Sequence, residues 1–199
     1  MAKAERKARV LKAASECFGK YGYEKTTLDD IGKVVGLNKA SLYYYYKNKE
    51  DIFCDVLYKE ADIYMTELQK KIKGSRSAEG KVLSYLGERL NYYRTVVNLH
   101  NLSMDTVRKV EPLFTEIYDK ILAKESVFLA SLIKEGVEAG EFVKSDANRI
   151  ADVLLNVATS IRYRQLHVSY VTMAGEADYN KISDEIRYVS KLILKGMKA

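Results

Sequence analysis

Residues that break helices are scarce in this chain, and this scarcity is the strongest constraint on its fold. One proline and 11 glycines occur in 199 residues. Between them, apolar residues recur at intervals of three and four, which is the spacing of an amphipathic helix. The hydrophobic fraction of 47% and the charged fraction of 30% are ordinary for a globular protein. The sequence therefore predicts an all-α protein with long helices.

Glycines and capping side chains divide the chain into about nine expected helices. Four glycines suit helix ends: Gly22, Gly36, Gly140 and Gly175. Four residues suit helix starts: Thr27, Asn38, Asn48 and Pro112. Thr27 opens a sequence typical of a capping box, with Asp30 at its third helical position. The expected helices cover approximately residues 4–21, 27–36, 38–46, 48–74, 78–98, 103–109, 112–139, 146–172 and 179–196.

Several protein classes are disfavoured by what the sequence lacks. No apolar run approaches the ~18 residues of a transmembrane helix, and the N-terminus has no apolar core like that of a signal peptide. We therefore expect a cytoplasmic protein with no membrane partner. Cys17 and Cys54 lie far apart in apolar helical patterns, which favours two small buried side chains. No spacing of cysteines or histidines indicates a metal site, and we expect no cofactor.

Positive charge is concentrated at the N-terminal end. Residues 1–50 hold 11 lysines and arginines against 6 acidic residues, whereas the remaining residues hold 22 against 21. This asymmetry indicates an anionic partner for the first quarter of the chain, although a solvated basic face would have the same composition.

Four consecutive tyrosines, Tyr43 to Tyr46, lie in the stretch LNKASLYYYYKNKED at residues 37–51. Because Asn38 precedes them as a helix cap and Asn48 follows as another, we expect them within about two helical turns rather than in a strand. Helical spacing places Tyr46 on the inward face with Leu42, while Tyr43 and Tyr44 point largely outward and Tyr45 is intermediate.

A helix, a glycine-containing turn and a second helix with a basic, tyrosine-bearing surface form a helix-turn-helix layout. In such a unit the second helix enters the DNA major groove. Lys39 can donate to guanine or to phosphate, while Ala40 and Ser41 are small enough for close approach. The helix that begins after Asn48 offers a phosphate site at its N-terminus, beside Lys49.

Residues of this region resemble the DNA-binding domain of the TetR (tetracycline repressor-like) family of bacterial regulators. The similar stretches are AASECFGKYGYEKTTLDDIGKVVGL and NKASLYYYYKNKEDIF, between about Arg9 and Phe53. Ala40 stands where glycine is common in the family, and Tyr46 where phenylalanine is common. The resemblance implies that phosphates are contacted by Thr27, Tyr43, Tyr45 and Lys49. It implies that the residues nearest the bases are Lys39, Ala40 and Tyr44. Ser41 could make either kind of contact.

The resemblance also implies an organisation for the whole chain: a DNA-binding domain in residues 1–50 and an effector-binding and dimerisation domain in residues 51–199. The implied pocket lies among the middle helices, where the candidate lining residues are Tyr92, Tyr93, Val96, His100, Phe114, Tyr118, Tyr163 and His167. Nearby charges are Glu88, Asp105, Glu116 and Arg162. Aromatic lining of this kind fits a mostly apolar effector, and it is compatible with either a lipophilic cation or a fatty-acyl-like molecule.

Two apolar stripes near the C-terminus are candidates for a homodimer interface, although intrachain core would show the same spacing. The stripes consist of Ile150, Leu154, Val157 and Ile161, and of Ile182, Ile186, Val189 and Ile193.

The sequence thus predicts a ligand-responsive transcriptional repressor, a homodimer that leaves a palindromic double-stranded DNA operator when a small effector binds. The alternatives are a DNA-associated helical protein without sequence specificity and a helical enzyme. No recognisable catalytic motif is present, which disfavours the enzyme.

Overall fold

The chain is all-α, as predicted, in a computed structural model that describes residues 3–72, 77–168 and 171–199 and, for residues 113–117, the backbone alone. The described residues form nine α-helices and two short 3-10 helices. The α-helices are α1 (Lys3–Tyr21), α2 (Leu28–Val35), α3 (Lys39–Tyr43), α4 (Lys49–Ile72), α5 (Ala78–Leu99), α6 (Met104–Val110), α7 (Thr115–Glu138), α8 (Ala147–Val168) and α9 (Tyr179–Lys195). The 3-10 helices are η1 (Glu111–Phe114) and η2 (Ala174–Glu176).

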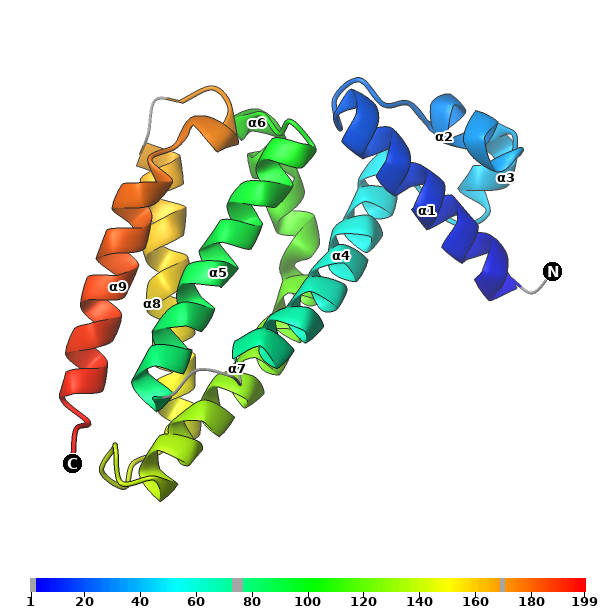
Figure 1. Cartoon of the computed structure of the whole chain (residues 1–199). Coiled ribbons are helices and arrows are strands. Elements are labelled where there is room, and N and C mark those ends of the chain that lie inside the picture. The colour runs from blue at the N-terminus through cyan, green and yellow to red at the C-terminus, as the bar shows by residue number, and fades with distance from the viewer. Residues whose placement is uncertain (1–2, 73–76, 169–170) are drawn as a thin grey trace.

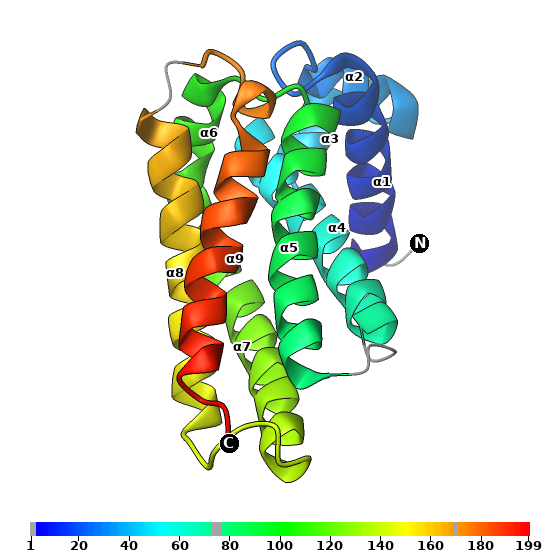
Figure 2. The ribbon, with the colours of Figure 1, turned by 60° about the vertical axis from the view of Figure 1, so that its left-hand side comes forward.

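Helix α4 lies between an N-terminal unit and a C-terminal bundle. In Figure 1, α1, α2 and α3 lie to the right of α4, and α5, α8 and α9 lie to its left. Figure 2 shows α5 with α9 on one side and α4 on the other, and α5 packs against both. α8 and α9 run side by side in both views. The single long helix α4 therefore joins the two parts.

The predicted caps shape the N-terminal unit. Gly22 and Gly36 follow α1 and α2 in the left-handed conformation, with φ of 80° and 73°. The Thr27 hydroxyl accepts the Asp30 amide at 3.2 Å, and the Asp30 carboxylate accepts the Thr27 amide at 2.9 Å, which completes the capping box. Asn38 caps α3 by accepting a backbone N–H. These local bonds fix where the second helix of the motif begins.

Helix α3 is shorter than predicted, and its early end determines where the side chains of Tyr43 to Tyr46 lie. It ends at Tyr43, and the Tyr45 amide donates to the Leu42 carbonyl at 2.9 Å in a tighter turn. Tyr46 is buried, and its hydroxyl donates to Asp55 of α4 at 3.0 Å. The predicted inward position of Tyr46 is confirmed, but the side chain reaches it from a turn instead of from a helix.

Both ends of α4 are held by packing against other helices. At its start, the Asn48 side chain accepts the Asp51 amide at 2.7 Å, as predicted for a cap. Phe53 packs edge-on against Phe18 of α1, with ring centroids 5.1 Å apart. Further along, Met65 accepts a hydrogen bond from the buried Tyr85 hydroxyl of α5 at 3.9 Å. The 24 residues of α4 span about 36 Å, so one rigid element reaches both parts.

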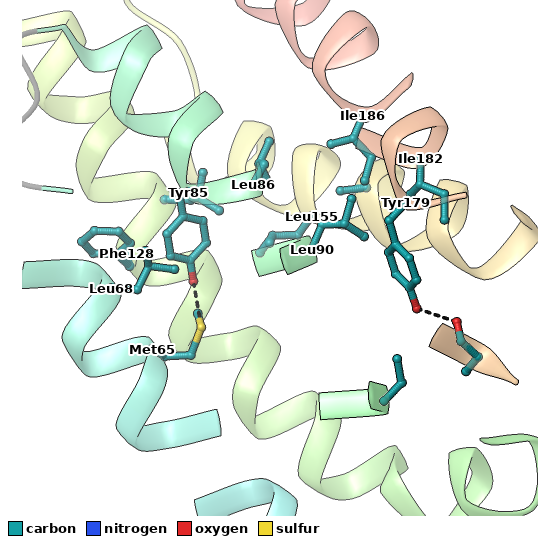
Figure 3. Packing of buried hydrophobic residues seen from close by; sticks show 14 of the residues in the cluster. Met65, Leu68, Tyr85, Leu86, Leu90, Phe128, Leu155, Tyr179, Ile182 and Ile186 are labelled. Atoms are coloured by element: carbon teal, nitrogen blue, oxygen red, sulfur yellow. Dashed lines mark hydrogen bonds between the residues drawn. The ribbon is translucent and has the colours of Figure 1, made fainter. Parts of the chain in front are cut away.

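The core of the C-terminal bundle is formed by apolar side chains from α4, α5, α7, α8 and α9. Figure 3 shows Tyr85 between Met65 and Phe128, with Leu86, Leu90 and Ile186 on the other side of α5. Tyr179, at the start of α9, is buried and donates to the Ala174 carbonyl at 3.0 Å.

Two predicted helix boundaries in the bundle are wrong, and a tertiary contact accounts for the second. Pro112 lies in η1, and α7 begins only at Thr115. α8 ends at Val168 instead of 172, and Gly175 lies in η2. The Thr172 carbonyl accepts the Met104 amide at 2.8 Å, so the chain here bonds to the start of α6 instead of continuing its own helix.

Replacing Tyr46 with alanine tests whether this buried tyrosine, unlike the exposed Tyr44, stabilises the fold. We expect Tyr46→Ala to lower the free energy of unfolding by about 3 kcal/mol or more, because it empties a packed core position. Tyr44 is 69% exposed, so Tyr44→Ala is the matched control and should change stability by less than about 0.5 kcal/mol. Thermal unfolding followed by circular dichroism measures both. Equal losses of stability would contradict the assignment.

Candidate functional site

Helix α3 and the turn after it present an aromatic and basic surface to solvent. Tyr43 and Tyr44 are 50% and 69% exposed, and Lys39 and Ala40 are exposed beside them. Tyr45 is half-buried, with its ring packed edge-on against Tyr44 at 5.1 Å. The phenol hydroxyls can donate to phosphate oxygens, and the lysine ammonium can donate to phosphate or guanine.

Lys3 is a basic residue of this surface that was not among the predicted contacts. The Lys3 ammonium lies 4.9 Å from the centre of the Tyr44 ring, so α1 adds a positive charge beside the tyrosines. Lys3 and Lys7 are four residues apart on one helical face, and that spacing was the available signal.

Three other candidate contact residues already have intramolecular roles. The exposed Thr27 hydroxyl belongs to the cap of α2, and Ser41 is half-buried in α3. The Lys49 ammonium donates to the carbonyls of Tyr23 at 2.9 Å and Thr26 at 3.1 Å, and burial lowers its pKa. Because the Lys49 ammonium points toward these carbonyls, it holds the loop between α1 and α2 on α4. This orientation disfavours a direct phosphate contact by Lys49.

A partly buried polar contact joins the N-terminal unit to the bundle. Glu60 of α4 accepts from the Ser15 hydroxyl of α1 at 2.7 Å and lies 3.2 Å from His100 Nε2, at the end of α5. His100 is fully buried, and its ring packs edge-on against Phe53 at 5.2 Å. Burial raises the pKa of Glu60, but the bonds from His100 and Ser15 more than offset this and hold it below its ordinary value. His100 is therefore a joint residue, and its predicted place in the pocket is wrong.

A second contact joins the two parts nearby. Glu24, in the loop before α2, accepts hydrogen bonds from the hydroxyls of Thr106 and Ser103 at the start of α6. The bond from Thr106, followed by that from Ser103, lowers the pKa of the Glu24 carboxyl. The loop leading into the helix-turn-helix is thus attached to α6 as well as to α4.

The bundle encloses a cavity of about 330 Å³ lined by residues of α4 to α9. This volume lies at the small end of the range for small-molecule pockets. Five predicted residues line it: Tyr92, Tyr93, Val96, Tyr118 and Tyr163. Phe114 has a side chain outside the described residues, as does Glu116. His167 is not in the lining, because its ring stacks on Tyr163 and lies 3.4 Å from Glu111.

A polar cluster in the cavity wall was missed by the sequence analysis. The Arg89 guanidinium donates from Nε to Glu125 at 2.7 Å, and from Nη2 to Tyr118 at 3.3 Å and Thr159 at 3.2 Å. Tyr85 also donates to Glu125, at 3.2 Å. The helical spacing from Arg89 to Tyr93 and Val96 was a signal for Arg89. Glu125 and Thr159 come from other helices, so local sequence gave no indication of them.

The two candidate dimer stripes divide into buried and half-buried residues. Leu154, Ile182 and Ile186 lie in the chain's own core, so they offer little surface to a partner chain. Spacing by three and four marked the faces on which α8 and α9 pack within the chain. The half-buried members are Ile150, Val157, Ile161, Val189 and Ile193. Larger apolar exposure occurs at Val153, Tyr188 and Leu192, which are 41%, 66% and 53% exposed.

Known proteins share both the motif and the overall architecture. Residues 10–56 match the family model described as bacterial regulatory proteins, tetR family. The chain is 25% identical to the HTH-type transcriptional regulator QacR of Staphylococcus aureus, over 96% of this chain and 97% of that one. It is 24% identical to the fatty acid metabolism regulator protein of Bacillus subtilis, over 72% and 74%. A transcriptional regulator from Cytophaga hutchinsonii is similar in structure, with a TM-score of 0.77 and 27% identity over 96% and 97%.

The helix-turn-helix, the bundle and these relatives define a DNA-binding transcriptional regulator and not an enzyme. Within the chain, residues 10–56 are similar to the tetR family of bacterial regulatory proteins. None of the helices among the described residues has the combined length and apolar character needed to cross a membrane.

Removing one partner of the buried pair tests the cavity wall. We expect Arg89→Leu to destabilise the fold by about 3–5 kcal/mol, because it leaves the Glu125 charge buried and uncompensated. The double variant Arg89→Leu/Glu125→Leu should recover most of this loss. Lys124→Met is the control, since it breaks a solvent-exposed pair with Asp62 and should change the melting temperature little. Chemical denaturation measures all three. A double variant no more stable than Arg89→Leu would contradict the pairing.

Proposed function

We propose that the protein is a ligand-responsive repressor, which leaves a palindromic operator when a small, largely apolar or aromatic effector enters the cavity of the bundle. Residues 1–50 serve as the DNA-binding domain and residues 51–199 as the effector and dimerisation domain. The observation that carries the proposal is the placement of the cavity: α4 and α5 line it, and the same two helices make the Glu60–His100 contact beside α1. A protein acting on an operator works in the cytoplasm, where bacterial DNA lies.

The proposed assembly is a homodimer formed through the outer faces of α8 and α9. Val153, Tyr188 and Leu192 supply exposed apolar area on these faces. A two-fold dimer presents two copies of α3 about one DNA turn apart, ~34–36 Å, and thus reads a palindrome. Effector binding then favours a dimer conformation in which this separation no longer matches the operator.

The proposal is tested by fluorescence anisotropy on duplex DNA from the region upstream of the protein's own gene, against scrambled duplex, at two salt concentrations. We expect at least a ~10³-fold preference for one specific sequence, either in this region or among random duplexes after selection. Equal, salt-dependent binding to every selected duplex would contradict a sequence-specific regulator and support a general DNA-binding protein.

The exposed tyrosine next to the recognition helix should contribute to sequence preference. We expect Tyr44→Ala to reduce the preference for operator over scrambled duplex by about tenfold, equivalent to ~1.4 kcal/mol of base discrimination. Tyr21→Ala removes a tyrosine that is 48% exposed at the end of α1 and is the matched control. The ratio of the two dissociation constants is the measurement. An unchanged ratio for Tyr44→Ala would remove Tyr44 from base recognition.

The joint at Glu60 should carry the response to the effector. A 100-fold effector-induced loss of operator affinity needs a coupling of ~2.7 kcal/mol. We expect Glu60→Gln to leave effector binding in place but to reduce the induced loss of operator affinity by about tenfold, because the charged bonds to Ser15 and His100 are weakened. Glu67→Gln makes the same change at an exposed site of α4 and should have no effect. Operator titrations with and without effector measure both variants. An intact response in Glu60→Gln would exclude this joint from the coupling.

A further inference from the structure

The cavity wall contains a positive charge with no acidic partner among the described side chains. Arg162 of α8 is 8% exposed, and its guanidinium lies 3.9 Å from the centre of the Tyr93 ring. Within the described part of the chain, no carboxylate oxygen comes within 4.0 Å of it. A ring face compensates a cation only partly, and a buried charge without a counterion is costly. An anionic group bound beside Arg162 would therefore gain a charge-assisted contact.

The other charges that line the cavity do not supply this anion. Glu125 is neutralised by Arg89, whose Nε lies 2.7 Å from it. Glu111 lies 3.4 Å from His167, whose imidazole carries a positive charge only when it is protonated. Tyr118 lies in the positive field of two cations, Arg89 and Arg162. Tyr118 is sensitive to this field: burial raises its pKa, but the Arg89 and Arg162 cations outweigh burial and hold the pKa below its ordinary value.

The rest of the lining is suited to an apolar body with a single polar head. Its aliphatic side chains include Leu57, Leu90, Val96, Val107 and Val110. The Tyr92 hydroxyl is buried in the same wall and has no hydrogen-bond partner among the described residues. This phenol is a donor that a bound acceptor oxygen can satisfy.

We propose that the effector is an apolar molecule bearing one anionic group, which binds the Arg162 guanidinium while the apolar body fills the cavity beside Tyr92 and Tyr93. This inference rests on the proposed function and assigns the chemical class of its ligand. A lipophilic cation would instead place its charge near Arg162. The acidic side chains that line the cavity are Glu111 and Glu125. Glu111 lies beside His167, and Arg89 already balances the charge of Glu125.

Three probes with the same chain and different heads test the charge class. Isothermal titration calorimetry of the full-length protein, without DNA, compares dodecanoate, dodecanol and dodecyltrimethylammonium. We expect dodecanoate to bind about 10- to 100-fold more tightly than dodecanol, because it adds a charge-assisted contact. Tighter binding of the ammonium probe, equal binding of all three, or no binding of any would overturn the proposal.

Variants of α8 locate the contact. Arg162→Met should weaken dodecanoate by about 10- to 100-fold and leave dodecanol unchanged, while Arg162→Lys should lose less. Arg164→Met removes an exposed arginine of the same helix and is the matched control. Because Arg162 has no carboxylate within 4.0 Å among the described residues, Arg162→Met should not lower the melting temperature of the ligand-free protein. Equal weakening of dodecanoate and dodecanol in both Arg162 variants would overturn the assignment.

The two proposals fail in distinguishable ways. Selective binding of dodecanoate that leaves operator affinity unchanged supports the anion site and counts against the proposed effector response. Release of the operator by dodecyltrimethylammonium, with no effect of dodecanoate, supports the response and overturns the anion site.

Discussion

The half-buried carboxylate of Glu60 is the contact on which the proposed communication between the two parts depends. It stands on α4 and bonds to Ser15 in the DNA-binding unit and to His100 at the end of α5. α5 also supplies Tyr92 and Tyr93 to the cavity wall. A ligand that displaces α5 therefore acts on a partly buried hydrogen bond to a carboxylate, which is costly to leave unmade. This makes the contact suited to two discrete arrangements rather than gradual deformation.

Tyrosine is used in three ways, because it combines a large apolar ring with a polar tip. Tyr46 buries its ring and bonds to Asp55, which attaches the helix-turn-helix to α4. Tyr44 keeps its ring in solvent, where it can contact DNA. Tyr93 places its ring under the Arg162 cation in the cavity. Position relative to the helix axis, and not residue type, separates these roles.

Local sequence was sufficient to predict the helices and the DNA-binding motif, because caps and helical spacing act over a few residues. The Thr27 capping box and the Gly36 turn illustrate this. Predictions that depended on distant contacts were weaker. Arg89 and Glu125 are 36 residues apart, so no local pattern could pair them. The spacing of Leu154 and Ile186 showed a buried face, but it could not show whether that face packs against the same chain or a partner.

Coupling between the cavity and the DNA-binding surface is reciprocal if both belong to one equilibrium. Its most direct measurement is the affinity of the protein for dodecanoate, determined by calorimetry once in free protein and once in protein saturated with operator DNA. With coupling through α4 and the Glu60 joint, operator DNA should weaken dodecanoate binding at least ~5-fold, the lower end for allosteric systems. Equal affinities in the free and operator-bound protein would show that this ligand does not distinguish the two states and would contradict the coupling.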